Sequence, residues 1–169
     1  FLQSSQQGPE ADATGYKGFY YHFLDMETGK RAWQCEVSTI DTAILMAGVL
    51  SAQSYFTQSC LEEREIREIA DFLYLRVEWP WALNGAETFA HGWTPEKKFQ
   101  RYRWNRNYSE AIILYALALG SPTHAVNPKG YQQWTATFET TKLYDIEWLH
   151  AGPLFIHQMA HLWLDFRGI

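Results

Sequence analysis

Residues 18–50, GFYYHFLDMETGKRAWQCEVSTIDTAILMAGVL, decide the fold, and they change character halfway along. Residues 18–33 are dense in aromatic side chains and contain the turn signal Met26-Glu27-Thr28-Gly29, so they predict a β-hairpin. From Gln34 the apolar residues fall near positions i, i+3, i+7, i+8 and i+11, which is helical spacing. We therefore expect a hairpin followed directly by a helix that runs to about Phe56.

Two acids fall at the expected start of this helix, Glu36 and Asp41. The positive end of the helix dipole favours carboxylates there. An aromatic hairpin that leads into such a helix is typical of one wall of a sugar-binding cleft. On a regular helix the two side chains would point about 140° apart. We therefore expect Asp41 to bind a neighbouring helix or a sugar hydroxyl, away from the group that Glu36 faces.

The remaining chain alternates helical patterns with one more aromatic insertion. Residues 1–17 are polar with Gly and Pro and predict a loop or frayed end. We expect helices over 61–77, 108–119, 127–138 and 153–166, a second aromatic hairpin over 89–104 that turns at 94–96, and a polar connection over 139–145. The 153–166 helix is apolar nearly all round, so it is expected to be buried.

Composition narrows the function classes. The 169 residues suit one domain, and 47% of them are hydrophobic, enough for a sizeable core. Aromatic residues reach 17%, which fits either a large aromatic core or a carbohydrate cleft. A net charge of −5 gives no electrostatic case for nucleic acid or an anionic membrane. No apolar run is long enough to span a bilayer.

The two cysteines, Cys35 and Cys60, fix neither a disulfide nor a redox compartment. The first residue is not Met, and the start lacks the basic and apolar parts of a signal peptide. We interpret the sequence as a processed product or a piece of something longer.

Several unusual blocks occur in order: FYYHFLDMETGKRAW, EVSTIDTAIL, WPWALN, HGWTPE, YRWNRNYSEAIILYALALGSPTH and AGPLFIHQMAHLWLDFRGI. Together they resemble the bacterial glycoamylase-like domain, a family that includes enzymes acting on β-1,2-glucans and domains of cyclic β-1,2-glucan synthases. The resemblance implies a mainly α fold, an (α/α)6 toroid of helical hairpins with aromatic β-hairpin insertions and a site in the central cavity. Residues 18–169 would be part of that barrel, because the family normally has further helices on both sides. The rest of a larger polypeptide would then complete it.

Hydrolysis of a glycosidic bond ordinarily uses two carboxyl groups. Glu36 is the first choice for the general acid, and the resemblance of QCEVSTIDTAIL to a family block supports it. A helix-capping carboxylate is the alternative. Glu110 is either a sugar contact or a cap, Glu96 fits an exposed turn acid, and Asp165 fits an ion pair with Arg167. The second catalytic carboxylate is therefore expected outside this chain.

Aromatic, imidazole and guanidinium groups can bind sugar rings and hydroxyls. The candidates in the two insertions are Trp33, His91, Trp93, Tyr102 and Arg103, and for each of them ordinary packing stays open. His157 and His161 stand four apart, a spacing that also serves metal ligands. No acid stands between them as in a zinc protease motif, so they are expected to line the cavity or the core. The resemblance favours the cavity, and we expect no metal and no cofactor.

The sequence therefore predicts a glycoside hydrolase, or part of one, that cleaves a β-glucan, most specifically a β-1,2-linked one. The partner would be a glucan oligo- or polysaccharide and not nucleic acid. The alternative is a non-catalytic carbohydrate-binding or structural segment of a larger glucan synthase. The resemblance places the protein in a bacterial periplasm or cell envelope.

Overall fold

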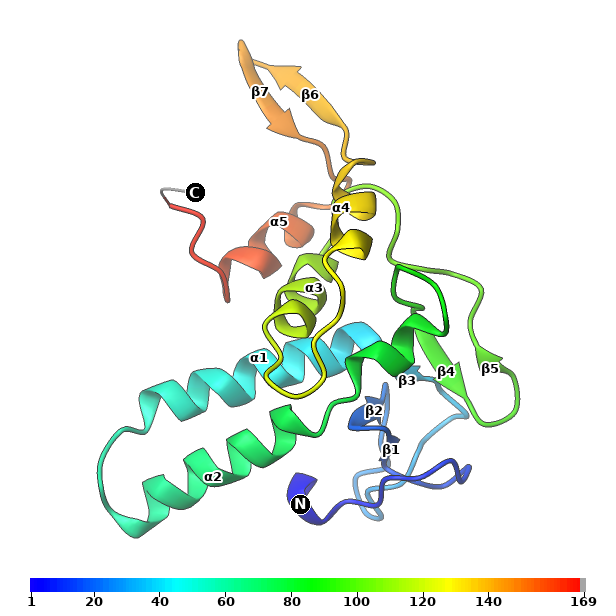
Figure 1. Ribbon diagram of the computed structural model, residues 1–169, viewed down its shortest axis with the longest axis vertical. Coiled ribbons are helices and arrows are strands. Elements are labelled where there is room, and N and C mark those ends of the chain that lie inside the picture. Colours follow the sequence, from blue (N-terminus) through cyan, green and yellow to red (C-terminus); the bar gives the residue numbers. More distant parts are fainter. Residues whose placement is uncertain (168–169) are drawn as a thin grey trace.

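The computed structural model describes residues 1–167, so the last two residues of the C-terminal block, Gly168 and Ile169, lie outside the described chain. A helical hairpin of α1 (Thr39–Tyr55) and α2 (Leu61–Leu75) lies beside an antiparallel sheet at one end, and α3 (Ala111–Leu119) crosses over α1 (Figure 1). The hairpin of β6 (Thr140–Leu143) and β7 (Ile146–Leu149) projects from the body (Figure 1). The fold is thus mixed, mainly helical with antiparallel sheet.

The elements follow one another as η1 (Leu2–Ser4), β1 (Gly15–Tyr16), β2 (Phe19–Tyr21), β3 (Val37–Ser38), α1 (Thr39–Tyr55), α2 (Leu61–Leu75), η2 (Trp79–Leu83), β4 (Gly92–Thr94), β5 (Lys98–Phe99), α3 (Ala111–Leu119), α4 (Lys129–Thr135), β6 (Thr140–Leu143), β7 (Ile146–Leu149) and α5 (Leu154–His161).

The five-stranded sheet has the order β1-β2-β3-β4-β5, and every pair is antiparallel. Its central strand β3 joins the two aromatic insertions, because Val37 pairs with Tyr21 on one side and with Trp93 on the other. The first hairpin therefore forms between β2 and β3. The predicted turn at residues 26–29 lies within the loop that connects these strands, where one isolated bridge joins Leu24 to Arg31.

The start of α1 corrects the sequence prediction. The helix begins at Thr39 and not near Gln34, because Val37 and Ser38 are paired in the sheet. Ser38 is the N-cap, and its hydroxyl accepts a hydrogen bond from the Asp41 amide at 3.2 Å. Asp41 lies in the first turn as expected, whereas Glu36 precedes the strand and caps no helix.

The patterns of α2, the β4–β5 hairpin, α3 and α4 predicted these elements correctly, with shorter bounds in the structure. The prediction of a polar connection over 139–145 was wrong, because β6 and β7 form a hairpin there. Tyr144 and Asp145 both have positive φ, 53° and 61°, which matches the twist of a tight hairpin turn. The β-branched and aromatic residues on either side of this turn were the sequence signal for the two strands.

The C-terminal helix also differs from its prediction. α5 ends at His161 instead of continuing to Phe166, and Ala160 is its one buried residue. Leu154 is 69% exposed and Phe155 is 50% exposed. The expectation of a buried helix is therefore wrong for the described chain, in which no element covers these side chains.

Aromatic side chains fill much of the core. Trp79, Trp134, Tyr115, Phe19 and Phe89 are fully buried, which agrees with the aromatic-core explanation of the composition. The N-terminal segment, although mostly loop, is held to the body by β1 and by buried Ala13. Within residues 1–167, no helix has the length and apolar character to cross a membrane.

Candidate functional site

A groove of about 760 Å³ lies where the two aromatic insertions meet. One wall is the segment before β3, and the other is the β4–β5 hairpin with the residues that follow it. Its lining is Gln34, Glu36, Thr94, Glu96, Lys97, Lys98, Phe99, Gln100, Arg101 and Tyr102. Ligand sites commonly have volumes of roughly 300–1,000 Å³, so this groove has a suitable size.

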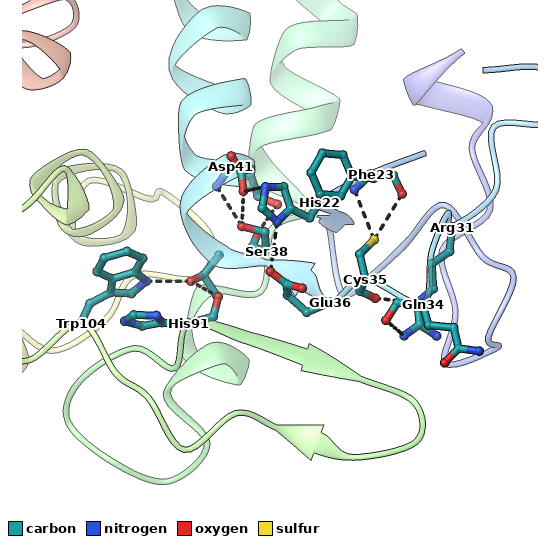
Figure 2. Close-up of polar contacts among 12 residues, drawn as sticks. His22, Phe23, Arg31, Gln34, Cys35, Glu36, Ser38, Asp41, His91 and Trp104 are labelled. Carbon is teal, nitrogen blue, oxygen red and sulfur yellow. Dashed lines mark hydrogen bonds and ion pairs between the residues drawn. The ribbon is translucent and has the colours of Figure 1, made fainter. Parts of the chain in front are cut away.

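Glu36 lies on the wall of this groove, with 28% of its side chain exposed. Its Oε1 is 3.1 Å from Nδ1 of His22, and its carbonyl oxygen accepts a hydrogen bond from the His22 amide at 2.9 Å (Figure 2). A Cβ atom added at Gly92 would lie 2.6 Å from Cγ of Glu36. Only glycine therefore lets the second insertion approach this acid so closely.

Asp41 reaches the same imidazole from the other side. Its Oδ2 is 3.4 Å from Nε2 of His22 and accepts a hydrogen bond from the Ser38 hydroxyl at 2.5 Å (Figure 2). The expectation that Glu36 and Asp41 face different groups was wrong, because Glu36 is not on the helix. The two acids converge on His22, with one ring nitrogen for each.

The sequence analysis did not identify His22. The signal exists in the register of the sheet, since Tyr21 pairs with Val37 and the next residues outward are His22 and Glu36. That register becomes visible only once the pairing of β2 with β3 is known.

The loop before Glu36 has an unusual backbone. Trp33 and Gln34 both have positive φ, 52° and 53°, a region that L-residues rarely adopt. Arg31 holds the loop with hydrogen bonds from Nε to the Cys35 carbonyl at 2.6 Å and from Nη2 to the Gln34 carbonyl at 2.8 Å (Figure 2). Trp33 is consequently presented to solvent, 84% exposed.

Arg31 also ties this loop to the second insertion. Its Nη1 donates to Oε1 of Glu96 at 2.8 Å, and its side chain is only 2% exposed. The Arg31 guanidinium, mainly by its hydrogen bond, lowers the pKa of Glu96 to about 2. Glu96 is thus a partner of Arg31 across the two walls of the groove, not a free turn acid.

An exposed aromatic strip leads from this loop toward Glu36. The ring of Trp33 lies 5.1 Å from that of Phe23, and Phe23 stacks on His22 at 4.2 Å. Flat, partly exposed rings of this kind can stack on the apolar face of a sugar. The sugar-binding role of Trp33 stays a prediction.

His91 and Tyr102 come from the second insertion. The His91 ring stacks on Trp104 at 3.9 Å, and Trp104 donates from Nε1 to the Thr39 hydroxyl at 3.1 Å (Figure 2). Burial lowers the pKa of His91, while the Arg103 backbone and the charge of Glu36 act in the opposite direction. Tyr102 is 59% exposed and lines the groove.

Trp93 and Arg103 serve packing, the alternative that the sequence left open. Trp93 is 5% exposed and packs against Tyr16 and Trp81, with ring centroids 4.9 and 5.8 Å away. The Arg103 guanidinium donates to the Thr88 hydroxyl at 3.2 Å and to nearby carbonyl oxygens at the base of the hairpin. Burial lowers the pKa of Arg103.

The other predicted residues lie away from this groove. Glu110 is the N-cap residue of α3, where its side chain makes no capping hydrogen bond. His157 stacks on Tyr108 at 5.2 Å, and both His157 and His161 line a separate cavity of about 570 Å³ with the β6–β7 hairpin. Asp165 binds Arg167 at 2.8 Å, as expected. Among residues 1–167, no three His, Cys, Asp or Glu side chains are grouped to hold a metal ion.

Comparisons with known proteins confirm the resemblance to the glycoamylase-like domain. Residues 101–169 match the glycoamylase family model, described as "Putative glucoamylase". A curated relative is the exo β-1,2-glucooligosaccharide sophorohydrolase of Parabacteroides distasonis. It is 28% identical over an alignment of 186 residues that covers 90% of this chain. The chain spans 26% of that relative's length.

Two solved structures extend the similarity to the fold. The endo-β-1,2-glucanase from Chitinophaga pinensis, in complex with sophorotriose and glucose, aligns with a TM-score of 0.73 at 25% identity, over 88% of this chain and 35% of that one. A "putative glucoamylase" from Bacteroides caccae aligns with a TM-score of 0.77 at 28% identity, over 97% of this chain and 41% of that one.

Proposed function

We propose that the chain is part of a glycoside hydrolase that cleaves a β-glucan, specifically a β-1,2-linked one, with Glu36 as general acid. The observation that carries the proposal is the position of Glu36, part-exposed on a groove wall between two aromatic insertions. The relatives named as β-1,2-glucan hydrolases support the substrate class.

The proposed chemistry follows from the groups on the groove. A general acid protonates the leaving oxygen, and a second carboxylate activates water or attacks the anomeric carbon. Glu36 would supply the proton. The exposed ring of Tyr102 on the groove and that of Trp33 on the loop before Glu36 would stack on sugar units. Asp41 would act through His22, so the second carboxylate would come from elsewhere in the parent protein.

We further propose that residues 18–169 form part of an (α/α)6 toroid. The solved relatives are more than twice as long as this chain, which spans 35–41% of them. The exposed apolar side chains of α5 support a further layer of helices over that face. In such a toroid the additional sugar contacts would be His91, Glu110, His157 and His161. A periplasmic or envelope location remains a prediction from the resemblance.

The alternative is a non-catalytic carbohydrate-binding segment of a larger glucan synthase. One observation favours it: the carboxylate of Asp41 already accepts the Ser38 hydroxyl and faces His22, so it is engaged and not free to act on water. The exposed aromatic strip would serve binding equally well.

Reducing-end release from β-1,2-glucan separates the two functions. In the parent protein that contains these residues, we expect the wild type to release reducing ends and Glu36→Gln to lose activity about 10²–10⁴-fold, the usual contribution of a general acid. Glu62→Gln is the matched control, because Glu62 lies on the first turn of α2. Full activity in Glu36→Gln removes Glu36 from the mechanism. Glucan binding without release by the wild type supports the alternative.

A further inference from the structure

We infer that His22 is a positioning residue for the reaction. Its Nδ1 orients the Glu36 carboxyl toward the groove, while its Nε2 is anchored to Asp41. The inference rests on the proposed function and adds a residue that the sequence patterns did not identify.

The backbone and the packing fix the imidazole ring. The His22 amide donates to the Glu36 carbonyl at 2.9 Å, so the two residues are held side by side across the first hairpin. The ring stacks on Phe23 at an interplanar angle of 11°. Phe23 is itself held by the Cys35 thiol, which lies 3.2 Å from its amide and 3.3 Å from its carbonyl oxygen (Figure 2). The ring nitrogens therefore keep a defined direction.

Asp41 anchors the far side of the ring. The Asp41 amide donates to the Ser38 hydroxyl at 3.2 Å, and that hydroxyl donates to Oδ2 of Asp41 at 2.5 Å. Both contacts belong to the N-terminal cap of α1. The groove acid is thus connected to the helix start through Glu36, His22, Asp41 and Ser38 in turn.

The arrangement also defines where protons can sit. A neutral imidazole has one N–H donor and one acceptor nitrogen. If Nε2–H donates to Asp41, Nδ1 can accept a hydrogen bond from a protonated Oε1 of Glu36. If Glu36 is ionised, the doubly protonated ring donates to both carboxylates. The two states hold the same number of protons and differ by one transfer between Nδ1 and Oε1. In the first state Glu36 carries the proton that a general acid donates.

The charged and titratable neighbours are consistent with this role. From the first insertion Glu36 faces the ring, and from α1 Asp41 faces it. His91 of the second insertion is close enough for the charge of Glu36 to raise its pKa, against the larger lowering by burial. The side chains of His22 and Glu36 are 39% and 28% exposed, so substrate and small solutes can reach them. Partly exposed ion pairs contribute little to stability, so a His22 variant should fold.

Steady-state kinetics of His22→Ala on β-1,2-glucan, measured in the parent protein that contains these residues, test the inference. We expect kcat to fall about 10²-fold, the size of effect that a misplaced catalytic group produces, with KM changed less than about twofold. Added imidazole should restore part of kcat, because the truncated site is open to solvent. His124→Ala is the matched control, since the His124 ring contacts Leu75 and Thr123 away from the groove. An unchanged kcat, or a loss confined to KM, overturns the inference.

Ring-nitrogen NMR separates this inference from the proposed function. In ¹H–¹⁵N spectra, Glu36→Gln should move the Nδ1 signal of His22 and Asp41→Asn should move its Nε2 signal, with His124 as reference. Signals that do not respond overturn the positioning contact even in an active enzyme. An inactive wild-type parent protein whose signals respond to both substitutions overturns the proposed function and supports the contact.

Discussion

Arg31→Met tests whether the Arg31 side chain connects the two aromatic insertions. The guanidinium of Arg31 is nearly completely buried and bonds to the Gln34 carbonyl, the Cys35 carbonyl and the Glu96 carboxylate. It also lies 4.9 Å from the centroid of the Tyr21 ring. Methionine keeps most of the apolar stem but removes every donor. The loop that carries Trp33 and Glu36 then loses its attachment to the rest of the site.

The expected loss can be estimated from the two carbonyl contacts. Hydrogen bonds from a charged donor contribute about 1.5–3 kcal/mol each. Gln34 is exposed and its carbonyl regains water, so we expect a total near the lower end, about 3 kcal/mol. The Glu96 carboxylate is exposed, and its ion pair adds little. The positive φ values of Trp33 and Gln34 persist only while other contacts hold them, which favours loosening of this loop.

Urea unfolding measures the effect. With a slope of about 1–3 kcal/mol per molar, a loss of about 3 kcal/mol lowers the midpoint by roughly 1–3 M at unchanged slope. Arg101→Met is the control, because Arg101 is exposed and its guanidinium bonds to the hydroxyl and lies over the ring of the neighbouring Tyr102; the variant should stay within about 0.5 kcal/mol of wild type. Arg31→Lys keeps the charge but not the fork and should resemble Arg31→Met. Equal midpoints for Arg31→Met and Arg101→Met would refute the stabilising connection that Arg31 makes between the two insertions.

Two further predictions concern the second insertion. Gly92→Ala places a Cβ atom 2.6 Å from both Cγ of Glu36 and the Val37 carbonyl oxygen. This overpacking should lower the free energy of unfolding in urea by about 1–3 kcal/mol. The control Gly152→Ala, whose Cβ would have no atom within 4 Å, should be neutral. A Gly92→Ala midpoint equal to that of Gly152→Ala contradicts the close approach. Arg31 holds the pKa of Glu96 at about 2, below its ordinary 4.5, so the ionised form stabilises the folded state above about pH 4.5, and this contribution is lost as the pH falls toward 2. Glu96→Gln should remove that part of the stability–pH curve, and a curve parallel to wild type between pH 4.5 and 2 would be contrary evidence.

The local patterns predicted most elements well. The amphipathic spacing of α2 and the turn residues 94–96 of the second hairpin act over a few residues, and tertiary contacts did not overrule them. The β6–β7 hairpin was missed because its charged residues made it look like a loop, although its β-branched and aromatic residues favour strands.

The site was predicted less well, because long-range pairing decides it. Val37 fits the helical spacing that continues through Ile40 and Ile44, so the pattern alone extends the helix back past Glu36. The hydrogen bonds of β3 to β2 and β4 compete with that helix and remove Glu36 from it. The same pairing buries Trp93 and brings His22 beside the acid.

The sequence by itself determined the aromatic insertions, the helical hairpin and the family resemblance, because each is written in short runs of neighbouring residues. Only the tertiary structure decided which acid faces which partner. His22, Glu36 and Asp41 meet through the pairing of β2 with β3 and the cap of α1, and Arg31 meets Glu96 across the sheet. The physical reason is that hydrogen bonding between distant strands fixes the direction of these side chains, and no local periodicity encodes that pairing.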